Sequence, residues 1–350
     1  MAWLKAAQDS AVDRGVARGF SIGWSRDLKL RGWQPSYPET TGYIIPTLFD
    51  CSAYLNDADL RRRAIQMADW EISVQLPSGA VMGGTVNRPR RPAVFNTGQV
   101  MLGWLRAAAE TGDQRYVEAS SRAAHFLVHT QDADGGWSKG NSTFANATST
   151  TYNSRVGWAL LVHGAQTGDG AARAAGERNI AFTLGHQNNS GWFTNNCLDN
   201  PSAPLTHTIS YALEGILGAN AVQPRPEYVA AVRKTLDSLL PMIGTDGRIA
   251  GRFDASWKPT VTWSCLTGSA QLAGMLLQMA KLTGEVRYRE AGHRTLAFVK
   301  STQDCGHGDA GIRGGIAGSF PIDGDYGKYE ILNWPTKFFV DALLINEKVA

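Results

Sequence analysis

The 350-residue sequence has little of what marks several protein classes. It has four cysteines, and no two of them form a Cys-x-x-Cys pair. Scattered cysteines of this kind indicate a reduced, cytoplasmic protein, although a leader removed from the chain would place it in the periplasm or outside the cell. No basic segment followed by an apolar core opens the sequence, and no apolar run approaches about 18 residues, so neither a signal peptide nor a membrane span is expected.

The sequence also lacks a strong charge of either sign. The formal net charge is only +3, which argues against a dedicated nucleic-acid-binding protein. Hydrophobic residues make up 43% of the chain, enough for a large core. No cofactor is expected, and the oligomeric state is not specified by these features.

An internal repeat organises the chain. A helix ending in Gln, a Gly-rich turn and a second helix recur six times, with the marker at residues 8, 75, 131, 187, 241 and 303. The marker is Gln in all copies except the one with Pro241. A period of about 56 residues is typical of helical repeat architectures. We expect the Gln side chains to bond the backbone of the turns that follow.

The second helix of each unit is apolar nearly all round, which predicts a buried position. These helices are expected at Thr41 to Leu55, Thr97 to Glu110, Asn153 to Gln166, Thr206 to Ala219, Leu266 to Leu282 and Trp334 to Asn346. The first helices carry more charge and are expected outside. Six outer–inner pairs without a polar capping repeat predict a closed ring. The fold class is therefore all-α, an (α/α)6 toroid, formed by a single domain over residues 1–350.

The turns carry a family resemblance. The segment Gln131-Asp-Ala-Asp-Gly-Gly-Trp137 resembles turns of the terpene cyclase and prenyltransferase repeat superfamily, and also those of (α/α)6 polysaccharide lyases and glycoside hydrolases. Ser36 to Thr47, Trp263 to Gly268 and Asn333 to Phe339 are similar to segments of prenyltransferase-like, polysaccharide-associated bacterial proteins. The resemblance implies the toroid, but one fold hosts many functions. A squalene-type cyclase would need an Asp-x-Asp-Asp motif, which this sequence lacks.

A zinc site is a further alternative that the resemblance raises. Lanthionine cyclases share the toroid and bind zinc through two cysteines and a histidine. Cys265 is reminiscent of one such ligand, and Cys305 with His307 offers the others. Gly306 separates these last two residues, so the adjacent Cys-His pair is missing. Scattered cysteines are more often small core residues, and no metal is assigned.

In toroids of this kind, the loops that enter the inner helices line the cavity. The first such stretch, Ser36 to Pro46, contains Tyr37, Glu39 and Tyr43 between two prolines. A carboxylate in the first turn also suits the helix dipole, so Glu39 has a structural alternative. Asn96 and Asn153 are likewise suited to capping. Candidates at the other entrances are Asn96, Gln99, Asn153, Arg155, His207, Tyr211, Trp263, Asp325, Glu330, Trp334 and Lys337.

Two mechanisms follow from these residues. Glycoside hydrolysis usually requires two carboxylates, and ring closure would bring Asp325 or Glu330 opposite Glu39. The alternative is β-elimination by a polysaccharide lyase, with Asn153 and Arg155 neutralising a substrate carboxylate and His207 or Tyr211 as base and acid.

The remaining candidates would bind the sugar, which fits the supply of 11 Trp and 10 Tyr. They are Tyr37, Tyr43, Asn96, Gln99, Trp263, Trp334 and Lys337. The chain is thus expected to be an enzyme that cleaves a bacterial surface or exo-polysaccharide, with an oligo- or polysaccharide as its partner. A non-catalytic glycan-binding protein and an isoprenoid-handling protein remain as alternatives from other classes.

Overall fold

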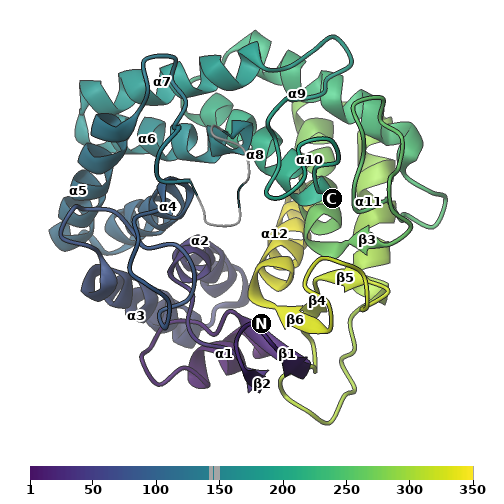
Figure 1. Cartoon of the computed structure of the whole chain (residues 1–350), viewed down its shortest axis with the longest axis horizontal. Coiled ribbons are helices and arrows are strands. Elements are labelled where there is room, and N and C mark those ends of the chain that lie inside the picture. Colours follow the sequence, from purple (N-terminus) through teal and green to yellow (C-terminus); the bar gives the residue numbers. More distant parts are fainter. Residues whose placement is uncertain (142–144, 146–149, 350) are drawn as a thin grey trace.

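A computed structural model describes residues 1–141, 145 and 150–349, and shows two concentric rings of helices (Figure 1). The outer ring contains α1 (Ala2–Asp9), α3 (Ala58–Val74), α5 (Gln114–Thr130), α7 (Gly170–Gly185), α9 (Pro226–Leu239) and α11 (Val286–Ser301). The inner ring contains α2 (Pro38–Leu55), α4 (Val94–Thr111), α6 (Ser154–Thr167), α8 (Thr206–Val222), α10 (Leu266–Thr283) and α12 (Asn333–Val349). The predicted (α/α)6 toroid is confirmed. No helix in the described ranges is both long and apolar enough to cross a membrane.

The inner ring closes on itself. Each inner helix packs against the next one, and α12 packs against α2. The last inner helix therefore lies beside the first, and yellow and purple segments meet at this joint in Figure 1. Closure brings the entrances of the first and last inner helices to one rim.

The marker glutamines hold neighbouring outer helices together. Gln75 Nε2 donates hydrogen bonds to the carbonyl of Gly79 in its own turn (2.8 Å) and to that of Ala119 in α5 (3.0 Å). Gln131 repeats the second contact one unit later, with the carbonyl of Ala175 in α7 (2.9 Å). The expected bond to the turn is thus present at Gln75, and both glutamines also join their outer helix to the next one.

A small sheet, which the repeat did not predict, closes the joint between the first and last pairs. Its antiparallel strands run in the order β2 (Leu30–Trp33), β1 (Gly19–Ser25), β6 (Glu330–Leu332) and β4 (Ile316–Ala317), and Gly19 lies opposite Leu332. A second pair joins β3 (Ser264–Cys265) to β5 (Ser319–Phe320). Two 3-10 turns, η1 (Thr151–Asn153) and η2 (Leu240–Met242), complete the elements.

The start of α2 follows from its sequence. Tyr37 precedes a proline and is extended (φ −124°, ψ 111°), and Pro38 begins the helix. Gly42 then allows α4 to approach, because a Cβ at this position would lie 2.6 Å from Val100. Pro46 lies inside the helix, as the sequence indicates. These features place Glu39 in the first turn, facing the axis of the ring.

One buried acid outside the axis leads to a stability prediction. Glu71 in α3 is fully buried, and neither of its carboxylate oxygens has a hydrogen-bond partner among the described residues. Burial raises the pKa of this carboxyl well above its ordinary value. The folded state therefore binds its proton more tightly than the unfolded state does, and this group destabilises the protein increasingly as pH rises above the unfolded pKa.

We expect Glu71→Met to raise the free energy of unfolding by about 1–3 kcal/mol, because it removes an unsatisfied polar group at similar volume. The gain should be larger near pH 8 than near pH 5, since the ionised form opposes folding. Urea denaturation of the variant and the wild type at both pH values measures this gain in the free energy of unfolding. A loss of stability at both pH values would instead show that Glu71 has a stabilising partner.

Candidate active site

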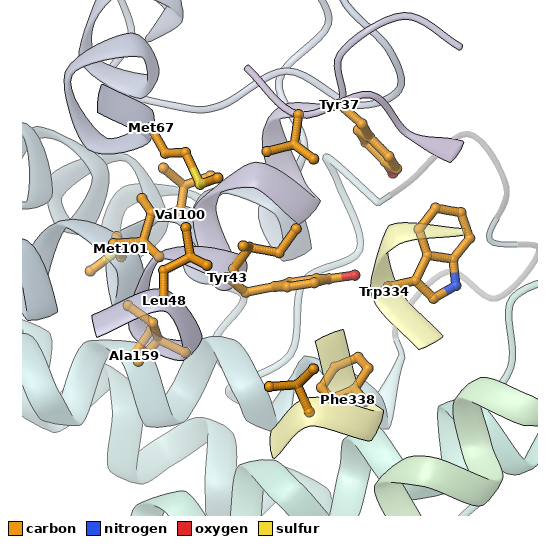
Figure 2. Close-up of a cluster of buried hydrophobic side chains, with 14 of the residues drawn as sticks. Tyr37, Tyr43, Leu48, Met67, Val100, Met101, Ala159, Trp334 and Phe338 are labelled. Atoms are coloured by element: carbon orange, nitrogen blue, oxygen red, sulfur yellow. The ribbon is translucent and has the colours of Figure 1, made fainter. Parts of the chain in front are cut away.

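A cavity of about 310 Å³ lies where the inner helices begin. Its charged lining residues are Arg18, Glu39, Asp199, Arg252 and Asp325. Most of the remaining wall is aromatic or histidine: Tyr37, Tyr43, Phe95, Tyr152, His207, Tyr211, Tyr326 and Trp334. Figure 2 shows Tyr37, Tyr43 and Trp334 around one space, with the core residues Leu48, Met67 and Val100 on the other side of α2. A concave, aromatic site with few polar groups is typical of small-molecule binding.

Glu39 is the buried acid of this cavity. Its side chain is 9% exposed, and Tyr37 donates a hydrogen bond from its hydroxyl to Glu39 Oε2 (2.6 Å). Burial raises the pKa of Glu39 to about 7, although the Tyr37 hydrogen bond and the charges of Arg155 and Arg18 act in the opposite direction. A carboxyl with such a pKa is partly protonated at neutral pH and can donate a proton to a ligand.

His207 is another buried titratable group in the wall of the cavity. Burial lowers the pKa of its imidazole to about 3, so the ring is neutral. Its Nδ1 lies 2.6 Å from Gln271 Oε1, and Gln271 Nε2 donates to Glu214 (3.0 Å). Because the amide donates to the carboxylate, its oxygen is left to accept from His207, and the ring proton is on Nδ1. The Nε2 atom, which has no hydrogen bond to a described residue, then carries a lone pair.

Behind His207, four hydrogen-bonded polar side chains cross the centre of the ring, and we call them the polar chain: Gln271, Glu214, Arg155 and Gln99. Glu214 accepts from Arg155 Nη1 as well as from Gln271, and Arg155 Nε donates to Gln99 Oε1 (2.6 Å). The guanidinium carbon lies 5.1 Å from the ring centroid of Tyr211. Arg155 is 4% exposed, so the ion pair is largely buried. The carboxylate that Arg155 neutralises is thus that of Glu214, from the chain itself.

The cavity brings together seven of the predicted residues: Tyr37, Glu39, Tyr43, His207, Tyr211, Asp325 and Trp334. Asp325 is exposed and lies in the loop before β6, whereas Glu39 is buried below it. Their common location agrees with the ring closure inferred from the repeats.

Glu330 does not face Glu39, contrary to expectation. It lies in β6, where its carboxylate accepts from Arg18 Nη1 (3.0 Å) and from Gln34 Nε2 (2.8 Å). The repeat predicts an entrance to the last inner helix at this point, but Glu330 belongs to a strand, and the pairing of β6 with β1 turns it into the small sheet. Of the two expected partners of Glu39, Asp325 lines the cavity and Glu330 does not.

Three further candidates lie deeper in the ring than the cavity at the start of the inner helices. Gln99 and Arg155 belong to the polar chain, and Lys337 pairs with Asp341 (2.6 Å). Arg155 and Lys337 line two other cavities, of about 350 and 260 Å³, on the opposite side of the polar chain. Arg155 is the second residue of α6, and Lys337 lies about one turn into α12, so a turn or less is enough to direct these side chains to the other side.

The two asparagines and Trp263 also lie outside the cavity. Asn96 is not a helix cap, because α4 begins at Val94, and its Nδ2 donates to the carbonyl of Met82 (3.1 Å). Asn153 ends η1 and makes no side-chain cap to α6. Trp263 is half-buried and packs beside Gly251.

The proposed zinc ligands do not form a cluster. Cys265 is buried at the start of α10, whereas Cys305 is exposed in the loop after α11. Among the described residues, no group of three His, Cys, Asp or Glu side chains is arranged to hold a metal ion.

Four further residues line the cavity although the sequence pattern did not predict them: Arg18, Phe95, Asp199 and Arg252. Phe95 lies at the entrance of α4, so its position in the repeat could have identified it. Arg18, Asp199 and Arg252 lie in segments that differ between copies, so the period gave no signal for them.

Comparisons with known proteins agree with this fold. Among solved structures, the chain is similar to an unsaturated glucuronyl hydrolase specific for heparin, with a TM-score of 0.77, 13% identity, and coverage of 99% of this chain and 95% of that chain. It is also similar to the unsaturated glucuronyl hydrolase from Bacillus sp. GL1 (TM-score 0.72, 15% identity, 98% and 93% covered). A third is the cellobiose 2-epimerase from Bacillus thermoamylovorans (TM-score 0.76, 12% identity, 98% and 95% covered). At such identities the likeness establishes the toroid alone.

No curated protein matches the sequence. The model of one protein family, described as the squalene-hopene cyclase C-terminal domain, matches residues 34–217. This range covers more than half of the chain, from two residues before the first inner-helix entrance through most of α8. The chain therefore belongs to the squalene-hopene cyclase C-terminal domain family.

Proposed function

We propose that this protein is a glycoside hydrolase that cleaves a sugar unit bound in the cavity at the start of the inner helices. The observation that carries the proposal is the buried carboxyl of Glu39, with a pKa of about 7, in the same cavity as the exposed carboxyl of Asp325. Two carboxyl groups in different environments can serve as acid and base. The similarity in fold to glucuronyl hydrolases and a sugar epimerase supports a carbohydrate ligand.

The roles follow from the two environments. Protonated Glu39 donates its proton to the glycosidic oxygen, and the bond from that oxygen to the anomeric carbon breaks. Solvated Asp325 accepts a proton from water, whose hydroxyl adds to the anomeric carbon. The products are a hemiacetal and the released alcohol, and no cofactor takes part in these steps. The aromatic walls, including Tyr37 and Trp334, would pack against the sugar ring.

The pH dependence tests the role of Glu39. Since the acid must be protonated, kcat/KM, which reports the pKa of the free enzyme, should decline as pH rises through about 7. Initial rates of reducing-end release at low substrate concentration, measured from about pH 5 to 9, would show this decline. In the Glu39→Gln variant, any residual activity should not decline around pH 7. A wild-type rate that rises through neutral pH would contradict the assignment of Glu39 as the acid.

A second candidate is β-elimination with His207 as the base. The observation favouring it is the neutral imidazole, whose Nδ1 is bonded to Gln271 and whose Nε2 is left to accept a proton. The predicted neutralising group is not available, because Arg155 is bound to Glu214 and Gln99. This makes elimination the weaker candidate.

His207→Asn separates the two mechanisms. Under hydrolysis, His207 contacts the sugar without transferring the proton that cleaves the bond, so we expect a loss in kcat/KM of about tenfold, mostly in KM. Under elimination, the loss would be about 10²–10⁴-fold in kcat, and wild-type digests would gain ultraviolet absorbance from an unsaturated product. The absorbance of the product, together with whether the substitution changes kcat or KM, distinguishes hydrolysis from elimination.

A further inference from the structure

The cavity contains two arginines, and both are already paired within the chain. Arg252 holds Asp199 in a two-point contact, with Nη1 to Oδ1 at 3.0 Å and Nη2 to Oδ2 at 2.7 Å. Its Nη1 also donates to the carbonyl of Ala203 (2.8 Å). A fork of this kind is how arginine recognises a carboxylate. In this cavity the fork is occupied by the chain's own acid.

Arg18 is also paired with a carboxylate of the chain, but through one nitrogen rather than a two-point fork. Its Nη1 donates to Gln34 Oε1 (2.6 Å) and to Glu330 Oε2 (3.0 Å), and its guanidinium lies 5.0 Å from the ring centroid of Trp334. Glu330 does not line the cavity itself, but its charge offsets that of Arg18. Both cations are thus balanced before any ligand enters.

The remaining charges of the wall are negative. Glu39 and Asp325 have no ion-pair partner among the described residues, and residues 142–144, 146–149 and 350 contain no charged side chain. A carboxylate brought into the cavity would meet these acids without a free cation. Such repulsion is strong where water is partly excluded, and it would also raise the pKa of Glu39 further.

The uncharged part of the wall suits hydroxyl groups. Five tyrosines line it, and the buried hydroxyl of Tyr43 has no hydrogen-bond partner among the described residues. A buried hydroxyl without a partner is costly, and a ligand hydroxyl would supply the missing bond. Aromatic faces beside these hydroxyl groups fit the alternating apolar and polar surface of a neutral sugar.

We infer that the sugar unit bound in this cavity is uncharged, and that Asp199 and Glu330 exclude a uronic acid by occupying the two arginines. This inference rests on the proposed function and specifies its substrate class. It differs from what the names of the glucuronyl hydrolases of similar fold would suggest. Asp199 and Glu330 are thereby specificity-determining residues, because they act on the substrate through Arg252 and Arg18.

Matched pairs of substrates test the inference. Aryl glucosides and glucuronides differ only at C6, as do aryl galactosides and galacturonides, and each is supplied as both anomers. We expect kcat/KM for the neutral member to exceed that of its uronate by about tenfold or more. Thermal-shift titrations with the corresponding methyl glycosides and methyl glycosiduronates give the binding preference separately from catalysis.

Asp199→Asn provides the sharper test, because it releases the fork of Arg252 at constant shape. The uronate-to-neutral ratio of kcat/KM should rise about tenfold relative to wild type. Asp323→Asn is the matched control: it removes one charge from an exposed residue of the same rim that does not line the cavity, and should leave the ratio unchanged.

Wild-type preference for the uronate, or no preference, would overturn the inference while leaving the hydrolase proposal in place. An unchanged ratio in Asp199→Asn would overturn the role of Asp199. Failure to bind or cleave any member of the panel would count against the proposed function itself.

Discussion

Glu39→Gln is expected to lower kcat by about 10²–10⁴-fold, the usual contribution of a general acid. The amide keeps the size of the side chain, and its oxygen can still accept the hydrogen bond from Tyr37 that Glu39 Oε2 accepts now. What is lost is the proton delivered to the leaving oxygen. Reducing-end assays at saturating substrate measure the effect directly.

Stability distinguishes this loss from a folding defect. The pKa of Glu39 in the folded protein, about 7, lies above its ordinary value of 4.5. The ionised group therefore opposes folding increasingly as pH rises between these values, and the variant should be as stable as wild type or more stable near pH 8. Glu71→Gln is the matched control, since Glu71 is also a buried acid with a raised pKa but lies outside the cavity. It should retain wild-type kcat.

Arg155→Met is expected to lower the free energy of unfolding by about 3–5 kcal/mol, because it leaves a mostly buried carboxylate without its cation. Arg155 contacts Gln99 and Glu214 and lies over the ring of Trp158 (5.4 Å). Burial already raises the pKa of Glu214, and loss of Arg155 would raise it further. The cost should therefore be greater at high pH and shrink as pH falls toward the unfolded pKa of Glu214.

A double-mutant cycle with Glu214→Gln isolates the pair. The second substitution removes the uncompensated charge, so the double variant should recover about 1–3 kcal/mol relative to Arg155→Met. Chemical denaturation of the four proteins provides the values. Additive losses in the two single variants would mean that Arg155 and Glu214 do not stabilise each other.

The period of the sequence was sufficient to predict the ring. Glutamine markers, Gly-rich turns and apolar second helices recur because the helix pairs pack on one another in similar ways, as the bonds of Gln75 and Gln131 illustrate. Ring closure likewise predicted that Asp325 and Glu39 would share one cavity, which they line together. These predictions used only features that all copies share.

What could not be predicted depends on segments that occur once. The sheet formed by β1 and β6 joins residues more than 300 positions apart, and it directs Glu330 to Arg18. The contact of Arg252 with Asp199 likewise joins two irregular loops. Side-chain depth was a second difficulty, because Arg155 and Lys337 lie only a turn or less beyond the entrances of their helices and yet line the opposite cavities.

A crystal structure of Glu39→Gln with a bound neutral oligosaccharide would test the central claim most directly. The account predicts one sugar unit in the cavity at the start of the inner helices, with its glycosidic oxygen within about 3 Å of the side-chain amide at position 39. Asp325 should lie on the side of the anomeric carbon that water approaches. A sugar bound only in the cavities lined by Arg155 and Lys337, or a glycosidic oxygen out of reach of position 39, would contradict it.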